Sequence, residues 1–187
     1  MANKRYDLTQ GPILAKLISL SLPIMATSVF QMAHNITNIF WLSRLGPGYV
    51  AAAGLASQFL WLAMAFMLMC RIGAEIGVSQ NMGQGKPEVA KQYAQNGFIL
   101  AIFIGIVFTA VVIVARSHLI RFFDMDDPYV VGLAGQYLAV IALSLPFTFG
   151  HFVITGVYGG YGNTKIPFYI NALALAINIT LSPILIF

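Results

Sequence analysis

Five long apolar segments, separated by short polar breaks, follow one another along the chain. A helix needs about 20 apolar residues to cross a bilayer, and each segment reaches that length. The breaks contain turn signals such as Gly-Pro-Gly and Gly-Gly-Tyr-Gly. The pattern predicts an all-α membrane protein, a polytopic transmembrane helix bundle that occupies residues 1–187. The predicted helices cover residues 13–42, 50–82, 89–115, 129–158 and 168–187.

The first predicted helix carries its polar residues in one line. Their spacings are four, four and three residues, so a helix places them on one face. They are Thr27, Gln31, Asn35 and Asn38, with His34 beside the line. A helix that is apolar on its other sides and carries amides on one is expected to face a bundle interior or a wet cavity. We therefore expect the other helices to cover this line.

The last predicted helix carries a matching line. Asn171, Asn178 and Ser182 are separated by seven and four residues, which again selects one face. Together the two lines predict a polar cavity wall that meets a substrate or an ion. The alternative interpretation is hydrogen bonding between helices, which contributes about 0.6 kcal/mol per bond in membrane bundles.

Arg71 and Glu75 form the only ionisable pair within an apolar span. They are four residues apart, so a helix brings their side chains together. A lone charge at this depth is costly, and pairing lowers the cost. Two interpretations stay open, a neutralised structural pair and an ion-coupling carboxylate.

The remaining titratable groups offer weaker candidates. His34 and His151 suit a proton relay, or hydrogen bonding within a membrane core, but the sequence supplies no further ligands for a metal site. The charged segment from Arg116 to Pro128 is predicted to be a surface loop with a short interfacial piece over residues 119–123. Its aspartates lack the later Gly and Glu of a calcium loop.

Composition supports a membrane protein. The chain has 187 residues, of which 59% are hydrophobic and 9% charged, whereas soluble domains carry about 25% charged residues. The net charge of +4 does not indicate nucleic acid, because the basic residues lie at the predicted helix ends. The single cysteine, Cys70, excludes an internal disulfide.

The distribution of lysine and arginine predicts the orientation. One side of the predicted bundle has more of them than the other, and the basic side of a membrane protein faces the cytoplasm. The first set is Lys4, Arg5, Lys16, Lys86, Lys91 and Lys165, and the second is Arg44, Arg116 and Arg121. We expect a multi-pass protein of the plasma membrane with a cytoplasmic N-terminus. The apolar, uncapped ending Pro-Ile-Leu-Ile-Phe predicts a fragment of a longer protein.

Several short motifs along the chain have an order and spacing that is typical of one family of membrane proteins. They are Leu-Pro at 22–23, Gln31, FWLSRLG ending at Gly46, AAAGLAS, VSQNMGQGKPEVAKQYA from Val78, GYGNTKIP from Gly160, and the NITLSPILIF ending. With these motifs, the chain from about Leu8 to Phe187 resembles the N-terminal half of multidrug and toxic compound extrusion (MATE) transporters.

The resemblance implies twelve helices in two six-helix bundles, of which this chain supplies five helices of the first. It implies secondary active efflux of amphipathic or cationic small molecules in exchange for sodium or protons. The expected partners are the lipid bilayer, a small-molecule substrate and the absent C-terminal bundle, with no cofactor, metal, nucleic acid or enzymatic activity. Many members carry Asp where this chain has Asn38 and Ser182, which do not titrate. Coupling would then fall to the other half or to another residue here.

Two other functions have less support in the sequence. A flippase for polyprenyl-linked lipids on the same fold would favour a strongly cationic cavity, and this chain offers only Arg71 at depth. A membrane-embedded enzyme would need a nucleophile or paired carboxylates at depth, and the spans contain one glutamate.

Overall fold

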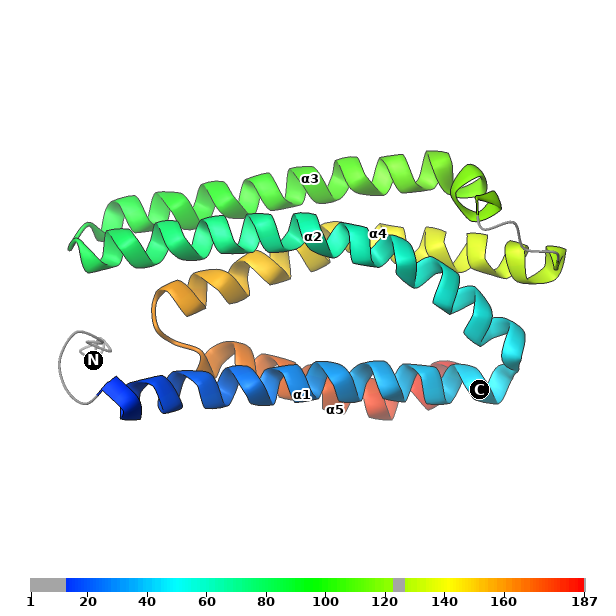
Figure 1. Cartoon of the computed structure of the whole chain (residues 1–187), viewed down its shortest axis with the longest axis horizontal. Coiled ribbons are helices and arrows are strands. Elements are labelled where there is room, and N and C mark those ends of the chain that lie inside the picture. The colour runs from blue at the N-terminus through cyan, green and yellow to red at the C-terminus, as the bar shows by residue number, and fades with distance from the viewer. Residues whose placement is uncertain (1–12, 123–126, 187) are drawn as a thin grey trace.

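The computed structural model describes residues 13–122 and 127–186, and this part of the chain is folded into five helices without a strand (Figure 1). The helices are α1 (Ile13–Leu45), α2 (Pro47–Gly83), α3 (Pro87–Arg121), α4 (Pro128–Gly160) and α5 (Lys165–Ile186). By length and composition, all five are able to cross a membrane. The prediction of a five-helix membrane bundle is confirmed.

Proline and glycine set the helix boundaries. α2, α3 and α4 each begin at a proline. N–H groups in the first turn of a helix have no partner within the helix, so proline, which lacks an N–H, loses no hydrogen bond there. The turns between helices use Gly46 (φ 127°) and Gly162 (φ 74°), at angles that residues with a Cβ rarely adopt.

The predicted surface loop after Ala115 is wrong in its first part, because α3 continues to Arg121. Ile120 is only 2% exposed and belongs to the hydrophobic core, so burial against the neighbouring helix favours further helical turns. Asp127 caps α4, where its carboxylate accepts a hydrogen bond from the Tyr129 N–H at 2.9 Å. The rest of the predicted loop, residues 123–126, lies outside the described residues.

The helices form two groups. α2, α3 and α4 pack against one another, while α1 and α5 run side by side (Figure 1). The buried hydrophobic cluster comes from α2, α3 and α4, and small residues such as Ala56, Ala101 and Ala134 are fully buried in it. Small side chains allow membrane helices to approach closely, and the buried Ala52 and Ala56 form such a small-residue face at the start of α2.

The expectation that all other helices cover the polar line of α1 is wrong. α5 lies along α1, and within the described residues α3 and α4 make no contact with it. The physical reason is that α2, α3 and α4 satisfy each other's small-residue faces. At Gly105, for example, a Cβ would lie 2.8 Å from the Cα of Pro146, so α3 and α4 touch through their backbones.

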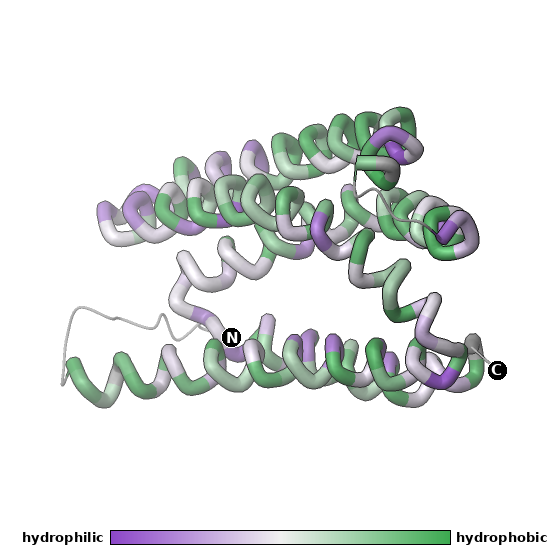
Figure 2. Tube along the Cα trace, turned by 45° about the vertical axis from the view of Figure 1, so that its right-hand side comes forward, coloured by the Kyte–Doolittle hydropathy of each residue, from purple (hydrophilic) through white to green (hydrophobic). Residues whose placement is uncertain are grey.

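Hydrophobic and basic residues occupy different parts of the helices. Hydrophobic residues dominate their lengths, and hydrophilic ones lie at the ends and turns and also at intervals along the pair of α1 and α5 (Figure 2). Lys86, Lys91 and Lys165 lie at the end of the molecule where α1 begins, whereas Arg44 and Arg116 lie at the opposite end. The two predicted sets of basic residues, as far as they are described, therefore fall at opposite ends.

Candidate functional site

The polar lines of α1 and α5 meet at Asn38 and Asn178. The side-chain Nδ2 of Asn178 donates a hydrogen bond to Oδ1 of Asn38 at 3.4 Å. Both residues are partly buried, and Oδ1 of Asn178 is a buried acceptor without a hydrogen-bond partner among the described residues. The contact thus joins two residues that are 140 positions apart in the sequence, and it leaves Oδ1 of Asn178 available as an acceptor.

The other members of the two lines are not brought together. Gln31 and Asn35 are exposed, and His34 and Ser182 are half-buried. Asn171 donates from Nδ2 to the carbonyl of Pro167 on its own helix at 2.7 Å. The structure therefore assembles the centre of the predicted wall and leaves the outer amides of α1 open to the surroundings.

Arg71 and Glu75 lie side by side on α2, with Arg71 Nε 3.6 Å from Glu75 Oε2. Their side chains are 31% and 37% exposed, so the pair is partly covered. The covering surface is the glycine-rich end of α4. A Cβ on Gly156 would lie 2.7 Å from Cγ of Arg71, and one on Gly159 would lie 2.7 Å from Oε1 of Glu75.

Gly156 and Gly159 did not stand out in the sequence, although they shape the surroundings of the ion pair. The available signal was the run Gly-Val-Tyr-Gly-Gly, whose glycines recur with helical spacing at the end of an apolar span. Only glycine permits α4 to approach the Arg71 and Glu75 side chains this closely.

The histidines stand apart from each other. His151 is half-buried on α4 within range of the Arg71 charge, and its carbonyl accepts a hydrogen bond from Thr155 Oγ1 at 2.9 Å. His34 lies on α1, which does not contact α4. No group of three metal-ligating side chains occurs in the part of the chain that the structure describes.

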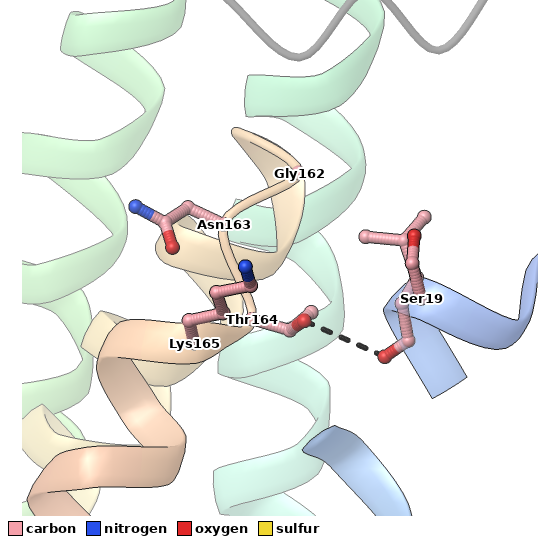
Figure 3. Close-up of a pocket in the computed structure, with 6 residues that line it drawn as sticks. Ser19, Gly162, Asn163, Thr164 and Lys165 are labelled. Carbon is pink, nitrogen blue, oxygen red and sulfur yellow. Dashed lines mark hydrogen bonds between the residues drawn. The ribbon is translucent and has the colours of Figure 1, made fainter. Parts of the chain in front are cut away.

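The loop between α4 and α5 contacts the beginning of α1. Thr164 Oγ1 donates a hydrogen bond to the carbonyl of Leu20 at 3.4 Å, and Figure 3 shows the loop residues around Ser19. The cavity beside this contact measures about 40 Å³, which suits an ordered water and is too small for a drug-sized substrate.

Five apolar helices, with an amide contact and an ion pair within their lengths, define a polytopic helical membrane protein. The sequence model of the MatE family matches residues 23–184, and the chain belongs to this family. The resemblance noted in the sequence is confirmed.

Relatives of the chain carry consistent descriptions. It is 28% identical over 173 residues to the probable multidrug resistance protein NorM of Thermotoga maritima, covering 92% of this chain and 37% of the relative. It is 27% identical over 184 residues to the probable multidrug resistance protein YpnP of Bacillus subtilis, covering 98% of this chain and 41% of the relative. The chain therefore spans well under half the length of these relatives.

Solved structures agree with the fold. One, described as the outward-facing conformation of a multidrug resistance MATE family transporter of the MOP superfamily, superposes with a TM-score of 0.91 at 26% identity. A second, a MOP superfamily transporter from Pyrococcus furiosus, gives 0.91 at 25% identity. Each match covers 100% of this chain and 41% of the other.

Proposed function

We propose that this chain is part of a secondary active transporter that exports amphipathic or cationic small molecules across the plasma membrane in exchange for sodium or protons. Its family and the multidrug-resistance descriptions of its relatives support the activity. The observation that carries the proposal is the contact between Asn38 and Asn178, because it places a buried, unpartnered acceptor between two apolar helices.

Amides suit a pathway for varied substrates. An amide both donates and accepts hydrogen bonds and carries no charge, so it can bind a cationic or a neutral guest without holding it as tightly as a carboxylate would. Gln31 and Asn35 extend the amide surface along α1 on its exposed side. We assign Gln31, Asn35, Asn38 and Asn178 to the wall of the pathway, with His34, His151, Asn171 and Ser182 at its edges.

Ion coupling needs a group that gains or loses an ion. Neither Asn38 nor Ser182 titrates. Among the described residues, Glu75 is the one carboxylate away from the helix ends, since Glu88 lies in the first turn of α3 and Asp127 caps α4. Carboxylate coupling within this part of the protein therefore falls to Glu75, with Arg71 as its partner, and otherwise to the part of the transporter beyond this chain.

A polyprenyl-lipid flippase is not favoured. The relatives named above are described as probable multidrug resistance proteins. Arg71, which would have to contribute to a pyrophosphate site, lies 3.6 Å from Glu75, and that pairing offsets its charge.

Transport by the full-length protein in proteoliposomes tests the proposal. Export of ethidium, a fluorescent amphipathic cation, is measured under a sodium gradient alone and a pH gradient alone. Export driven by one of the gradients and abolished when that gradient is collapsed is the expected result. Ethidium flux that equals that of protein-free vesicles under both gradients, with other amphipathic cations behaving alike, would exclude the proposed activity.

A further inference from the structure

A groove of about 380 Å³ lies between α2 and α3. This volume falls within the range of about 300–1,000 Å³ that small-molecule sites occupy. Met69 and Leu100, on opposite walls, are 71% and 52% exposed, so the groove opens to the surroundings. Gln92 and Asn96 contribute side-chain amides to one end.

The charged residues of α3 indicate how deep the groove lies. Lys91 and Arg116 are separated by about 37 Å at ~1.5 Å per residue, which corresponds to the hydrocarbon core of about 30 Å with part of its interfaces. Asn96 lies within about 8 Å of Lys91 along the helix, at the level of lipid headgroups and esters. Leu100 lies deeper, so the groove has a polar end at the interface and an apolar end in the hydrocarbon.

The two amides lack hydrogen-bond partners among the described residues. Gln92 and Asn96 are exposed and make no hydrogen bond to the other described residues. They lie one helical turn apart and face the same groove. Polar groups left without partners near hydrocarbon are costly. Lipid phosphate and ester oxygens are acceptors that the bilayer offers at this depth.

Charge at the polar end selects the headgroup. Lys86 caps the start of α3, and Lys91 is the sequence neighbour of Gln92, which lines the groove; both lysines are exposed, and neither forms an ion pair with a described residue. Glu88 lies one turn before Gln92 on the same line, so two positive charges stand against one negative charge. An anionic headgroup fits this balance better than a neutral one.

We propose that the groove is a binding site for an anionic glycerophospholipid. One acyl chain lies between Met69 and Leu100, and the amide N–H groups of Gln92 and Asn96 donate to the ester and phosphate oxygens. Lys91 neutralises the phosphate.

Gly73 offers a direct way to fill the site. It lines the groove, and a Cβ added there would meet nothing within 4 Å, so Gly73→Leu occupies the groove without a clash inside the protein. Gly54→Leu is the matched control, because Gly54 lies on the same helix, also has open space around it, and is outside the groove. Asn96→Leu removes an amide from the groove, and Gln95→Leu removes the neighbouring exposed one.

The experiment uses the protein reconstituted in nanodiscs that contain equal amounts of phosphatidylglycerol and phosphatidylcholine, followed by native mass spectrometry. We expect the parent protein to keep one phosphatidylglycerol molecule, and Gly73→Leu and Asn96→Leu each to lower that retention about tenfold. Gly54→Leu and Gln95→Leu should retain the lipid like the parent. Thermal unfolding confirms that each variant is folded.

Three results would overturn the proposal. Equal retention by all variants would mean that the lipid binds elsewhere on the protein. Equal retention of phosphatidylcholine would mean that the charge of the headgroup is not recognised. Loss of retention in the two control variants as well would mean that the effect does not belong to the groove.

Discussion

The hydroxyl of Thr109 on α3 donates a hydrogen bond to the carbonyl of Ala142 on α4 at 2.7 Å. Ala142 is fully buried, and its carbonyl would normally accept the N–H of the residue four positions later. That residue is Pro146, which has no N–H. Thr109 therefore supplies from a neighbouring helix the hydrogen bond that proline removes from α4.

Thr109→Val should destabilise the protein by about 1 kcal/mol, because it keeps the shape of the side chain and leaves the Ala142 carbonyl without a donor. Adding Pro146→Ala restores an N–H to that carbonyl, so we expect Thr109→Val to cost much less in that background. The measurement is the midpoint of thermal unfolding in detergent for both single variants and the double variant.

Thr148→Val is the control for this cycle. Thr148 donates from its hydroxyl to the carbonyl of Ser144 on its own helix. That carbonyl can also accept the backbone N–H of Thr148, so loss of the hydroxyl should have little effect. Equal destabilisation by Thr109→Val with and without Pro146 would show that the hydroxyl does not compensate for the proline.

The existence, order and approximate ends of the helices could be predicted from the sequence, because apolar length and turn residues are local signals. The i, i+4 spacing likewise brought Arg71 and Glu75 together. The end of α3 could not be predicted in this way. The burial of Ile120 depends on a helix that follows later in the chain.

Helix pairing was the less predictable part of the candidate site. The two polar lines predicted a shared cavity wall, and among their described residues Asn38 and Asn178 are the pair that bond across it. Asn171 instead bonds to its own helix. Which amide reaches its neighbour depends on helix rotation and depth, and these depend on packing along the whole contact rather than on spacing within one helix.

Asn38→Ala and Asn178→Ala should slow ethidium export several-fold while lowering stability by no more than about 1 kcal/mol, because one amide bond in a membrane bundle contributes little to stability. Initial export rates, normalised to folded protein, provide the measurement. Thr180→Ala on α5 is the control, since Thr180 is exposed and bonds only within its helix. If folded protein and transport are lost in parallel, the contact between Asn38 and Asn178 has a structural role alone.

Topology can be read from two exposed positions, Gln84 in the turn before α3 and His118 in the last turn of α3. In a Cys70→Ser background, we expect an impermeant thiol reagent to label His118→Cys in intact cells and to label Gln84→Cys only after the membrane is opened. The reason is that the lysine-rich end should face the cytoplasm. Labelling of Gln84→Cys in intact cells, with His118→Cys protected, would establish the reverse orientation.

Arg71 and Glu75 provide the sharpest test of whether this part of the transporter couples ions. Fully buried pairs that lose one partner cost about 3–5 kcal/mol, and partial exposure of this pair lowers our expectation to about 1–3 kcal/mol for Arg71→Met or Glu75→Gln alone. Methionine keeps the apolar stem that packs against Gly156, so the loss reports mainly on charge. The double variant should recover folded protein, because no uncompensated charge remains. Arg116→Met, at an exposed helix end, controls for removal of a positive charge.

Transport by the double variant then separates the two roles of the pair. If the pair is structural, ethidium export recovers along with the folded protein. If Glu75 couples ions, the double variant folds but does not export ethidium under a gradient. Binding of ethidium to the purified protein, measured by fluorescence, is then preserved. We expect the second result, because neither Asn38 nor Ser182 can exchange a proton and Glu75 is the one carboxylate away from the helix ends in the described chain. Losses of folded protein that simply add in the double variant would show that the two side chains do not stabilise each other, and neither role would stand.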